Sequence, residues 1–158
     1  FKVYQPLAYY AAYFTIRAEG SFNAPVILKG LESQKAELAR IAALEHSTAV
    51  EKGNATVIEV AAEMYLRGME FLPIDLDRSD ASEFKMVDGK LLPPFNCIPA
   101  LGDAVAKEIV RARDEHLFTS KEDLKKRGKV SQSIIDTMDS MGILKNMPDE
   151  EQISLFSF

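Results

Sequence analysis

Apolar residues recur at intervals of three and four along most of the chain, and glycine and proline divide this pattern into short segments. Such spacing places apolar side chains on one face of an α-helix, so the pattern predicts a set of short amphipathic helices. We expect helices over residues 6–20, from Glu32 or Ser33 to Leu44, and over residues 56–66. Their predicted core-facing residues are Leu7, Tyr10, Ala11, Phe14, Leu38, Ile41, Leu44, Val57, Val60, Ala61 and Met64.

The helical pattern gives way to alternation around Asp88-Gly89, a dipeptide that favours the positive φ angles of a tight β-turn. We expect a small β-hairpin over residues 84–92, ended by Pro93-Pro94 because neither proline can donate a hydrogen bond to a partner strand. The expected fold is therefore mainly α, with one small β-hairpin and a flexible C-terminal tail. Three further helices are predicted over residues 103–113, 120–128 and 132–141.

Composition excludes several classes of protein. With 47% hydrophobic and 27% charged residues, the chain is expected to be globular rather than disordered or collagenous. Its longest uncharged apolar run, residues 6–16, is about half as long as the roughly 20 residues that a membrane-spanning helix needs. Arg17-Ala18-Glu19 behind that run is not a small-residue cleavage site, so no signal peptide is expected. These features predict a cytoplasmic location and no membrane partner.

The chain has one cysteine, Cys97, and two histidines, His46 and His116. A single cysteine cannot form an internal disulfide, and these three residues lack the spacing of a zinc site. We therefore expect no zinc site in this chain. Because its first residue is Phe1 rather than methionine, we expect the sequence to be processed or to be cut from something longer.

Residues 98–103 have the pattern of a helix-hairpin-helix motif, in which a hairpin with proline and glycine leads into a second helix. Such a hairpin presents backbone N–H groups at the positive end of the helix dipole, where a DNA phosphate can bind without base readout. An ordinary turn between two helices, with Gly102 relieving strain, explains this stretch about equally well. The residues expected to contact phosphate are Pro99, Ala100, Leu101, Gly102, Asp103 and Lys107.

A second unit of the same kind follows over residues 124–141: a helix, a tight turn with glycine, and another helix. Two such units side by side would bind both DNA strands across a minor groove. Between Pro99 and Ser133 there are eight lysines and arginines and six acids, in a chain whose net charge is −5. This local basic excess favours contact with phosphate over a helix end that is merely solvated. The residues expected to contact DNA here are Lys126, Arg127, Gly128, Lys129 and Ser131.

The end of the sequence contains a short apolar motif behind an acidic stretch. A glutamine followed by adjacent leucine and phenylalanine suits a partner with one polar subsite and one deep apolar pocket, and it matches ligands of the bacterial sliding clamp. The alternative is that these apolar residues dock on this chain as a terminal strand. The residues expected to bind the clamp are Gln152, Ile153, Ser154, Leu155 and Phe156.

Together these motifs resemble the C-terminal end of bacterial replicative DNA polymerases of family C, in particular those of the PolC type. The resemblance covers essentially the whole chain, and two departures stand out. Ala100 replaces the usual hairpin glycine, which affects close approach of a phosphate, and Ser157-Phe158 extends past the usual end of the clamp motif. The stretches that carry the resemblance are residues 1–4, 9–14, 77–84, 93–96, 127–131 and 152–156.

The resemblance implies that residues 1–74 end the polymerase fingers and that residues 75–93 are a connector with the hairpin. It implies that residues 94–145 are a tandem helix-hairpin-helix domain that grips the primer-template duplex, and that residues 146–158 bind the sliding clamp. The rest of the polymerase chain is the third implied partner. The resemblance also implies that the palm carboxylates that hold two Mg²⁺ ions for nucleotidyl transfer are not in this chain. We therefore expect no catalytic residue, no metal site and no cofactor in this segment, and we expect the segment alone to be inactive.

Two other functions remain open at this stage. A free-standing helix-hairpin-helix DNA-repair protein would use the same hairpins, although the missing initial methionine and the fingers-like first helix argue against it. A helical protein-interaction domain would carry the basic patch only incidentally. Salt-dependent binding to duplex DNA separates the first two functions from the third.

Overall fold

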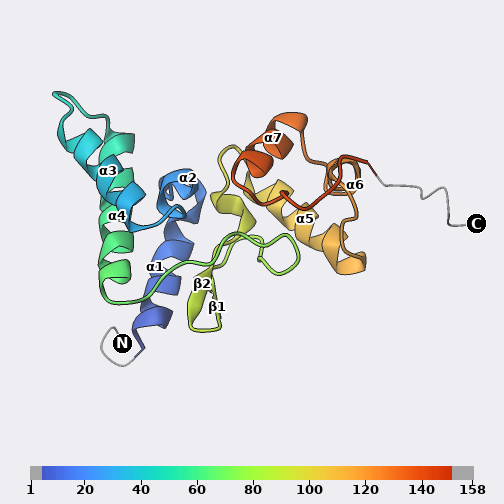
Figure 1. Ribbon diagram of the computed structural model, residues 1–158, viewed down its shortest axis with the longest axis horizontal. Coiled ribbons are helices and arrows are strands. Elements are labelled where there is room, and N and C mark those ends of the chain that lie inside the picture. Colours follow the sequence, from blue (N-terminus) through green and yellow to red (C-terminus); the bar gives the residue numbers. More distant parts are fainter. Residues whose placement is uncertain (1–4, 151–158) are drawn as a thin grey trace, which may run out of the picture.

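The protein is mostly helical with one small antiparallel hairpin, as the sequence predicts, and the computed structural model describes residues 5–150 (Figure 1). In Figure 1, α1 to α4 lie toward one end of the molecule, α5 to α7 lie at the other end, and the strands lie between them. The elements in chain order are α1 (Pro6–Ser21), α2 (Ala24–Ile27), α3 (Leu31–Ala42), α4 (Ala49–Leu66), β1 (Lys85–Val87), β2 (Lys90–Leu92), the 3₁₀ turn η1 (Phe95–Cys97), α5 (Asp103–Glu115), α6 (Lys121–Arg127) and α7 (Gln132–Ser140).

The first helix has the predicted limits. Pro6 lies in its first turn, where a missing N–H costs nothing, and the backbone leaves helical geometry at Glu19 and Gly20. Gly20 has φ +93°, a left-handed conformation that glycine adopts readily at a helix end. The core-facing residues predicted for this helix are confirmed: Leu7 is partly buried, and Tyr10, Ala11 and Phe14 are buried.

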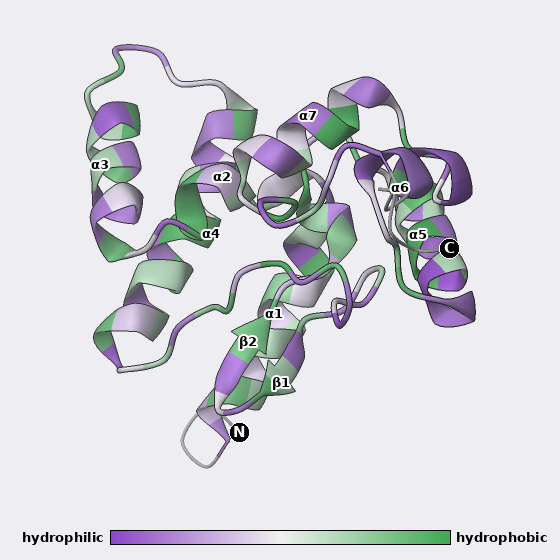
Figure 2. Cartoon of the chain, turned by 45° about the vertical axis from the view of Figure 1, so that its right-hand side comes forward, coloured by the Kyte–Doolittle hydropathy of each residue, from purple (hydrophilic) through white to green (hydrophobic). Residues whose placement is uncertain are grey.

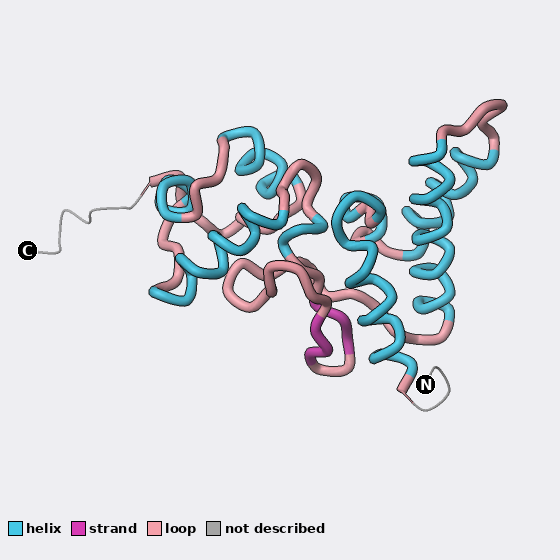
Figure 3. Tube along the Cα trace, turned by 180° about the vertical axis from the view of Figure 1, so that it is seen from behind, coloured by secondary structure: helices cyan, strands magenta, loops and turns pink. Residues whose placement is uncertain are grey.

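An aromatic cluster around Phe14 holds α1 against the loop between α4 and β1. Phe14 is fully buried, and its ring centroid lies 5.1 Å from that of Phe71 and 5.7 Å from that of Phe84. Both partner rings belong to the long loop that Figure 3 shows between the fourth helix and the hairpin. The cluster therefore fixes where this loop passes α1.

The fourth helix begins earlier than the sequence analysis predicted. It starts at Ala49 and passes through Gly53, whereas a start at Thr56 was expected. Thr48 and Glu51 form a capping box: the Thr48 hydroxyl accepts from the Glu51 N–H at 3.1 Å, and the Glu51 carboxylate accepts from the Thr48 N–H at 3.0 Å. These two bonds stabilise the start by about 1 kcal/mol, enough to offset the cost of an internal glycine.

The region from α2 to α3 differs from the prediction in three details. The short helix α2 was not predicted, and it begins next to Pro25, a residue that favours a first helical turn. The side chain of Leu44 is 37% exposed rather than core-facing, because α3 ends at Ala42. Gln34 is fully buried instead, and its amide donates to the Ile27 carbonyl at 3.0 Å, which joins α3 to α2.

The predicted β-hairpin is present, with Met86 opposite Leu91 across its two strands. Asp88 and Gly89 at its turn have φ +51° and +77°, the positive values that this dipeptide predicts. The second strand also exchanges backbone hydrogen bonds with the stretch before it: the Leu72 N–H donates to the Leu91 carbonyl at 2.8 Å. The hairpin is thereby attached to the chain that leaves α4.

Buried apolar residues of α5, α6 and α7 belong to the same hydrophobic core as those of α1 and α4. A buried arginine adds polar contacts between α5 and the connector. Arg113 of α5 is buried, and its guanidinium donates to the carbonyls of Leu76 and Ser79 in the connector. Figure 2 shows that hydrophilic residues dominate α6, whose only buried side chain is Leu124. None of the helices within residues 5–150 is long and apolar enough to cross a membrane.

Candidate nucleic-acid interface

Two hairpins with the same backbone conformation precede α5 and α7. Ala100 has φ +66° and Lys129 has φ +54°, and they occupy equivalent places in the first and second hairpin. Each is followed by a buried apolar residue, then by an N-cap residue in extended conformation, and then by the helix. The structure thus brings the two predicted motifs into one repeated form, which the sequences alone do not show.

The first hairpin keeps the left-handed conformation although alanine replaces the usual glycine. Ala100 is exposed, so its methyl group meets no neighbour in the core. The conformation costs a non-glycine residue about 1–2 kcal/mol. The first helix of this motif is only the single 3₁₀ turn η1, because Pro93, Pro94 and Pro99 leave room for no longer helix.

The two helix N-termini behind these hairpins differ in capping. At α5 the N-cap is Gly102, which has no side chain to accept a hydrogen bond, and the first intrahelical bond runs from the Ala106 N–H to the Gly102 carbonyl at 3.0 Å. At α7 the Ser131 hydroxyl accepts from the Ile134 N–H at 3.3 Å. The start of α5 therefore leaves more of its N–H groups for an external acceptor.

Three of the predicted lysines extend from this region into solvent. The side chains of Lys107, Lys126 and Lys129 are 68%, 75% and 77% exposed. Each has a carboxylate within ion-pair distance: Asp103 at 2.9 Å, Glu122 at 3.2 Å and Glu108 at 3.9 Å, respectively. Exposed ion pairs contribute only about 0–1 kcal/mol, so a phosphate can replace these carboxylates at small cost.

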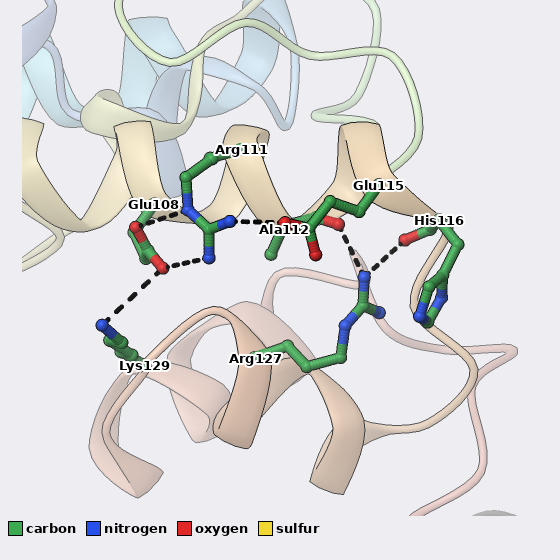
Figure 4. A network of polar contacts seen from close by, with 7 residues as sticks. All are labelled: Glu108, Arg111, Ala112, Glu115, His116, Arg127 and Lys129. Carbon is green, nitrogen blue, oxygen red and sulfur yellow. Dashed lines mark hydrogen bonds and ion pairs between the residues drawn. The ribbon is translucent and has the colours of Figure 1, made fainter.

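Arg127, unlike Lys129 in the same view, points toward the last turn of α5 (Figure 4). Its guanidinium donates to the carbonyls of Ala112 at 2.6 Å and His116 at 2.8 Å, and to the Asp123 carboxylate at 2.9 Å. These contacts attach the end of α6 to the last turn of α5. Arg127 therefore positions the second hairpin, and its donors lie among protein acceptors rather than in solvent.

Gly128 is tightly enclosed at the end of α6, by its own helix and by a side chain of α5. A Cβ atom at this position would lie 2.7 Å from the Leu124 carbonyl oxygen and 3.3 Å from a side-chain carbon of Ile109. Its φ is negative, so the requirement is for space and not for an unusual conformation. The glycine that sequence analysis assigned to a DNA contact is thus also a packing residue.

We expect Gly128→Ala to lower the free energy of unfolding by about 1–3 kcal/mol, because the added methyl forces backbone atoms apart. Gly102→Ala is the matched control, since a Cβ there meets nothing within 4 Å and φ is −75°. Urea denaturation of both variants measures the difference. Equal stability of the two variants would contradict this tight packing around Gly128.

The predicted clamp-binding residues, Gln152, Ile153, Ser154, Leu155 and Phe156, lie outside the described residues. The chain just before them is held against the N-terminal end of α6. The Lys121 N–H donates to the Pro148 carbonyl at 2.9 Å, and the Lys121 ammonium lies 3.3 Å from the Asp149 carboxylate. The other end of α6 leads into the second hairpin, so residues 148–149 and that hairpin lie at opposite ends of this helix.

Comparison with known proteins agrees with this geometry. A family model described as a helix-hairpin-helix motif matches residues 68–153. Proteins named DNA polymerase III PolC-type from Thermotoga maritima, Listeria monocytogenes and Bacillus subtilis are 47%, 49% and 47% identical to it over 99% of this chain. The chain spans 11% of the length of these relatives. It therefore belongs to the PolC-type DNA polymerase III family, as a segment that carries a helix-hairpin-helix motif.

Proposed function

We propose that this chain holds duplex DNA by its phosphate backbone as one part of a replicative DNA polymerase. The observation that carries the proposal is the repeated hairpin, in which Ala100 and Lys129 adopt the same conformation and each hairpin leads into a helix N-terminus. Backbone N–H groups at such ends attract an anion and carry no sequence information. The helix-hairpin-helix match and the names of the relatives support this use of the hairpins.

The proposal divides the chain into four parts. Residues 1–74 end the fingers, residues 75–93 connect, residues 94–145 grip the primer-template duplex, and residues 146–158 tether the polymerase to the sliding clamp. Attachment of Pro148 and Asp149 to α6 supports the last assignment, because it gives the tether a fixed root on the duplex-binding part. The remaining partner is the rest of the polymerase chain.

Nucleotidyl transfer belongs, in this proposal, to parts of the polymerase outside this chain. Within residues 5–150, no three acidic, histidine or cysteine side chains come together in an arrangement that could hold a metal ion. In nucleotidyl transfer, a pair of Mg²⁺ ions clamps the attacking and leaving oxygens. We assign those ions to the palm of the parent enzyme, and we assign this segment a binding role only.

The test measures the affinity of this chain for two short duplexes of unrelated sequence. Fluorescence anisotropy gives the affinity for each duplex at each concentration of a salt series. We expect similar affinities for both duplexes and a steep loss between about 50 and 200 mM salt, because contacts with phosphate release counterions. A strong preference for one sequence would contradict contact through the backbone alone. Salt-independent binding, or none, would favour the protein-interaction alternative.

A further inference from the structure

A carboxylate of α5 lies between the two hairpin units and holds cations from both of them (Figure 4). Glu108 Oε1 lies 2.6 Å from Arg111 Nη2 and 3.9 Å from Lys129 Nζ, and Glu108 Oε2 lies 3.1 Å from Arg111 Nε. Glu108 and Arg111 belong to the helix that follows the first hairpin. Lys129 is the left-handed residue of the second hairpin, so one carboxylate bridges the two units.

The arrangement imitates the way in which a phosphate is bound. A guanidinium that donates two hydrogen bonds to two oxygens, with an ammonium beside one of them, is a typical site for a phosphate group. Lys129 is 77% exposed and Arg111 is 55% exposed, so both cations can also be reached by an external anion. Glu108 is only 23% exposed, so it is less accessible to an external group than the two cations that it contacts.

We propose that Glu108 is an internal competitor for the DNA backbone: it holds Arg111 and Lys129 in the free protein, and both turn to phosphate when duplex DNA docks. This inference rests on the proposed duplex-binding function. Its consequence is weaker but more reversible binding, because each docking event must replace a carboxylate that is already in place. Such reversibility suits a part that must move along DNA without releasing it.

Electrostatics supports the competition. The hydrogen bonds from Arg111, with the charges of Arg111 and Lys129, lower the pKa of Glu108 below its usual value. The carboxylate is therefore negative at neutral pH, where DNA binding takes place. Replacing Glu108 by glutamine removes this charge while keeping the size and shape of the side chain.

The chain offers a closely matched control for that substitution. Glu115 lies on the same helix, and its Oε1 accepts from Arg111 Nη1 at 2.7 Å. No contact between Glu115 and Lys129 is present among the described residues. Glu108→Gln and Glu115→Gln therefore change the net charge equally and both remove a partner of Arg111, but only the first releases Lys129.

The experiment measures duplex affinity and its salt dependence for the 158-residue chain and the two variants, with melting curves to show that all are folded. We expect Glu108→Gln to tighten binding about three- to tenfold. We also expect it to steepen the slope of log K against log salt by about 0.9, the change that one additional phosphate contact produces. We expect Glu115→Gln to change affinity by less than about twofold. The gain from Glu108→Gln should shrink when Lys129→Gln is added.

The outcomes separate this inference from the function on which it rests. If wild-type protein binds duplex DNA with steep salt dependence but the two glutamate variants behave alike, the effect is one of net charge and the competition is wrong. A gain that persists in full in the Lys129→Gln background also contradicts it. If no variant binds the duplex, the proposed function fails and the competition fails with it.

Discussion

Replacing Lys107, Lys126 and Lys129 together by glutamate is expected to weaken binding to duplex DNA about 100-fold at moderate salt. These three side chains extend from α5, α6 and the second hairpin, and their carboxylate partners hold them only weakly. Reversal removes three contacts with phosphate and places three new negative charges beside it. The loss should be the same for every duplex sequence, because phosphate contacts carry no base information.

The matched control is the reversal of Lys35, Arg40 and Lys52, which are exposed on α3 and α4. In Figure 1 these two helices lie away from α5 to α7. It changes the net charge by the same amount and leaves the hairpins untouched. We expect a loss of less than about fivefold, from the long-range field alone. Equal losses for the two triple variants would show that net charge, and not the hairpin surface, governs affinity. Arg127 is left out because its guanidinium holds α6 to α5.

Replacing Leu155 and Phe156 by alanine is expected to abolish binding to the bacterial sliding clamp, a loss of at least about 100-fold. Burial of each side chain in an apolar pocket contributes about 1.5–3 kcal/mol, and part of this is offset by ordering of the segment. Micromolar to sub-micromolar affinity is therefore expected for the unchanged chain. Calorimetric titration of the chain and of the double variant against the clamp measures the loss.

Melting curves of the same two proteins test the alternative that these residues dock on their own chain. A tether that binds only the clamp leaves the thermal midpoint almost unchanged when Leu155 and Phe156 are truncated. A docked terminal strand would lower the midpoint by several degrees, because buried apolar area would be lost. Absence of clamp binding together with a clear destabilisation would overturn the tether proposal.

Local signals in the sequence predicted most of the fold. Pro6 and Gly20 mark the ends of α1, and Asp88-Gly89 specifies the hairpin turn, because each acts through its own backbone geometry. The start of α4 was missed because the Gly53-Asn54 pair is typical of a helix boundary. The capping box at Thr48 outweighs that signal, and its Thr-x-x-Glu pattern was present in the sequence.

The site was harder to predict, because packing decides which member of a basic run is free. Lys126 and Arg127 are neighbours in the sequence, yet one is 75% exposed and the other is 20% exposed. Arg127 lies three residues after the buried Leu124, on the same face of α6, and this spacing could have revealed its inward direction. The contact between Glu108 and Lys129 joins two elements far apart in sequence, and no local pattern predicts it.

The central claim is that backbone amides of both hairpins meet the DNA phosphates. The most direct test is a titration of the ¹⁵N-labelled chain with a short duplex, followed by amide chemical shifts. We expect the amides of residues 100–105 and 128–132 to shift first and in parallel, and to return when salt is raised, while the amides of α3 stay in place. Unchanged hairpin amides, with shifts in α3 or α4 instead, would contradict the claim.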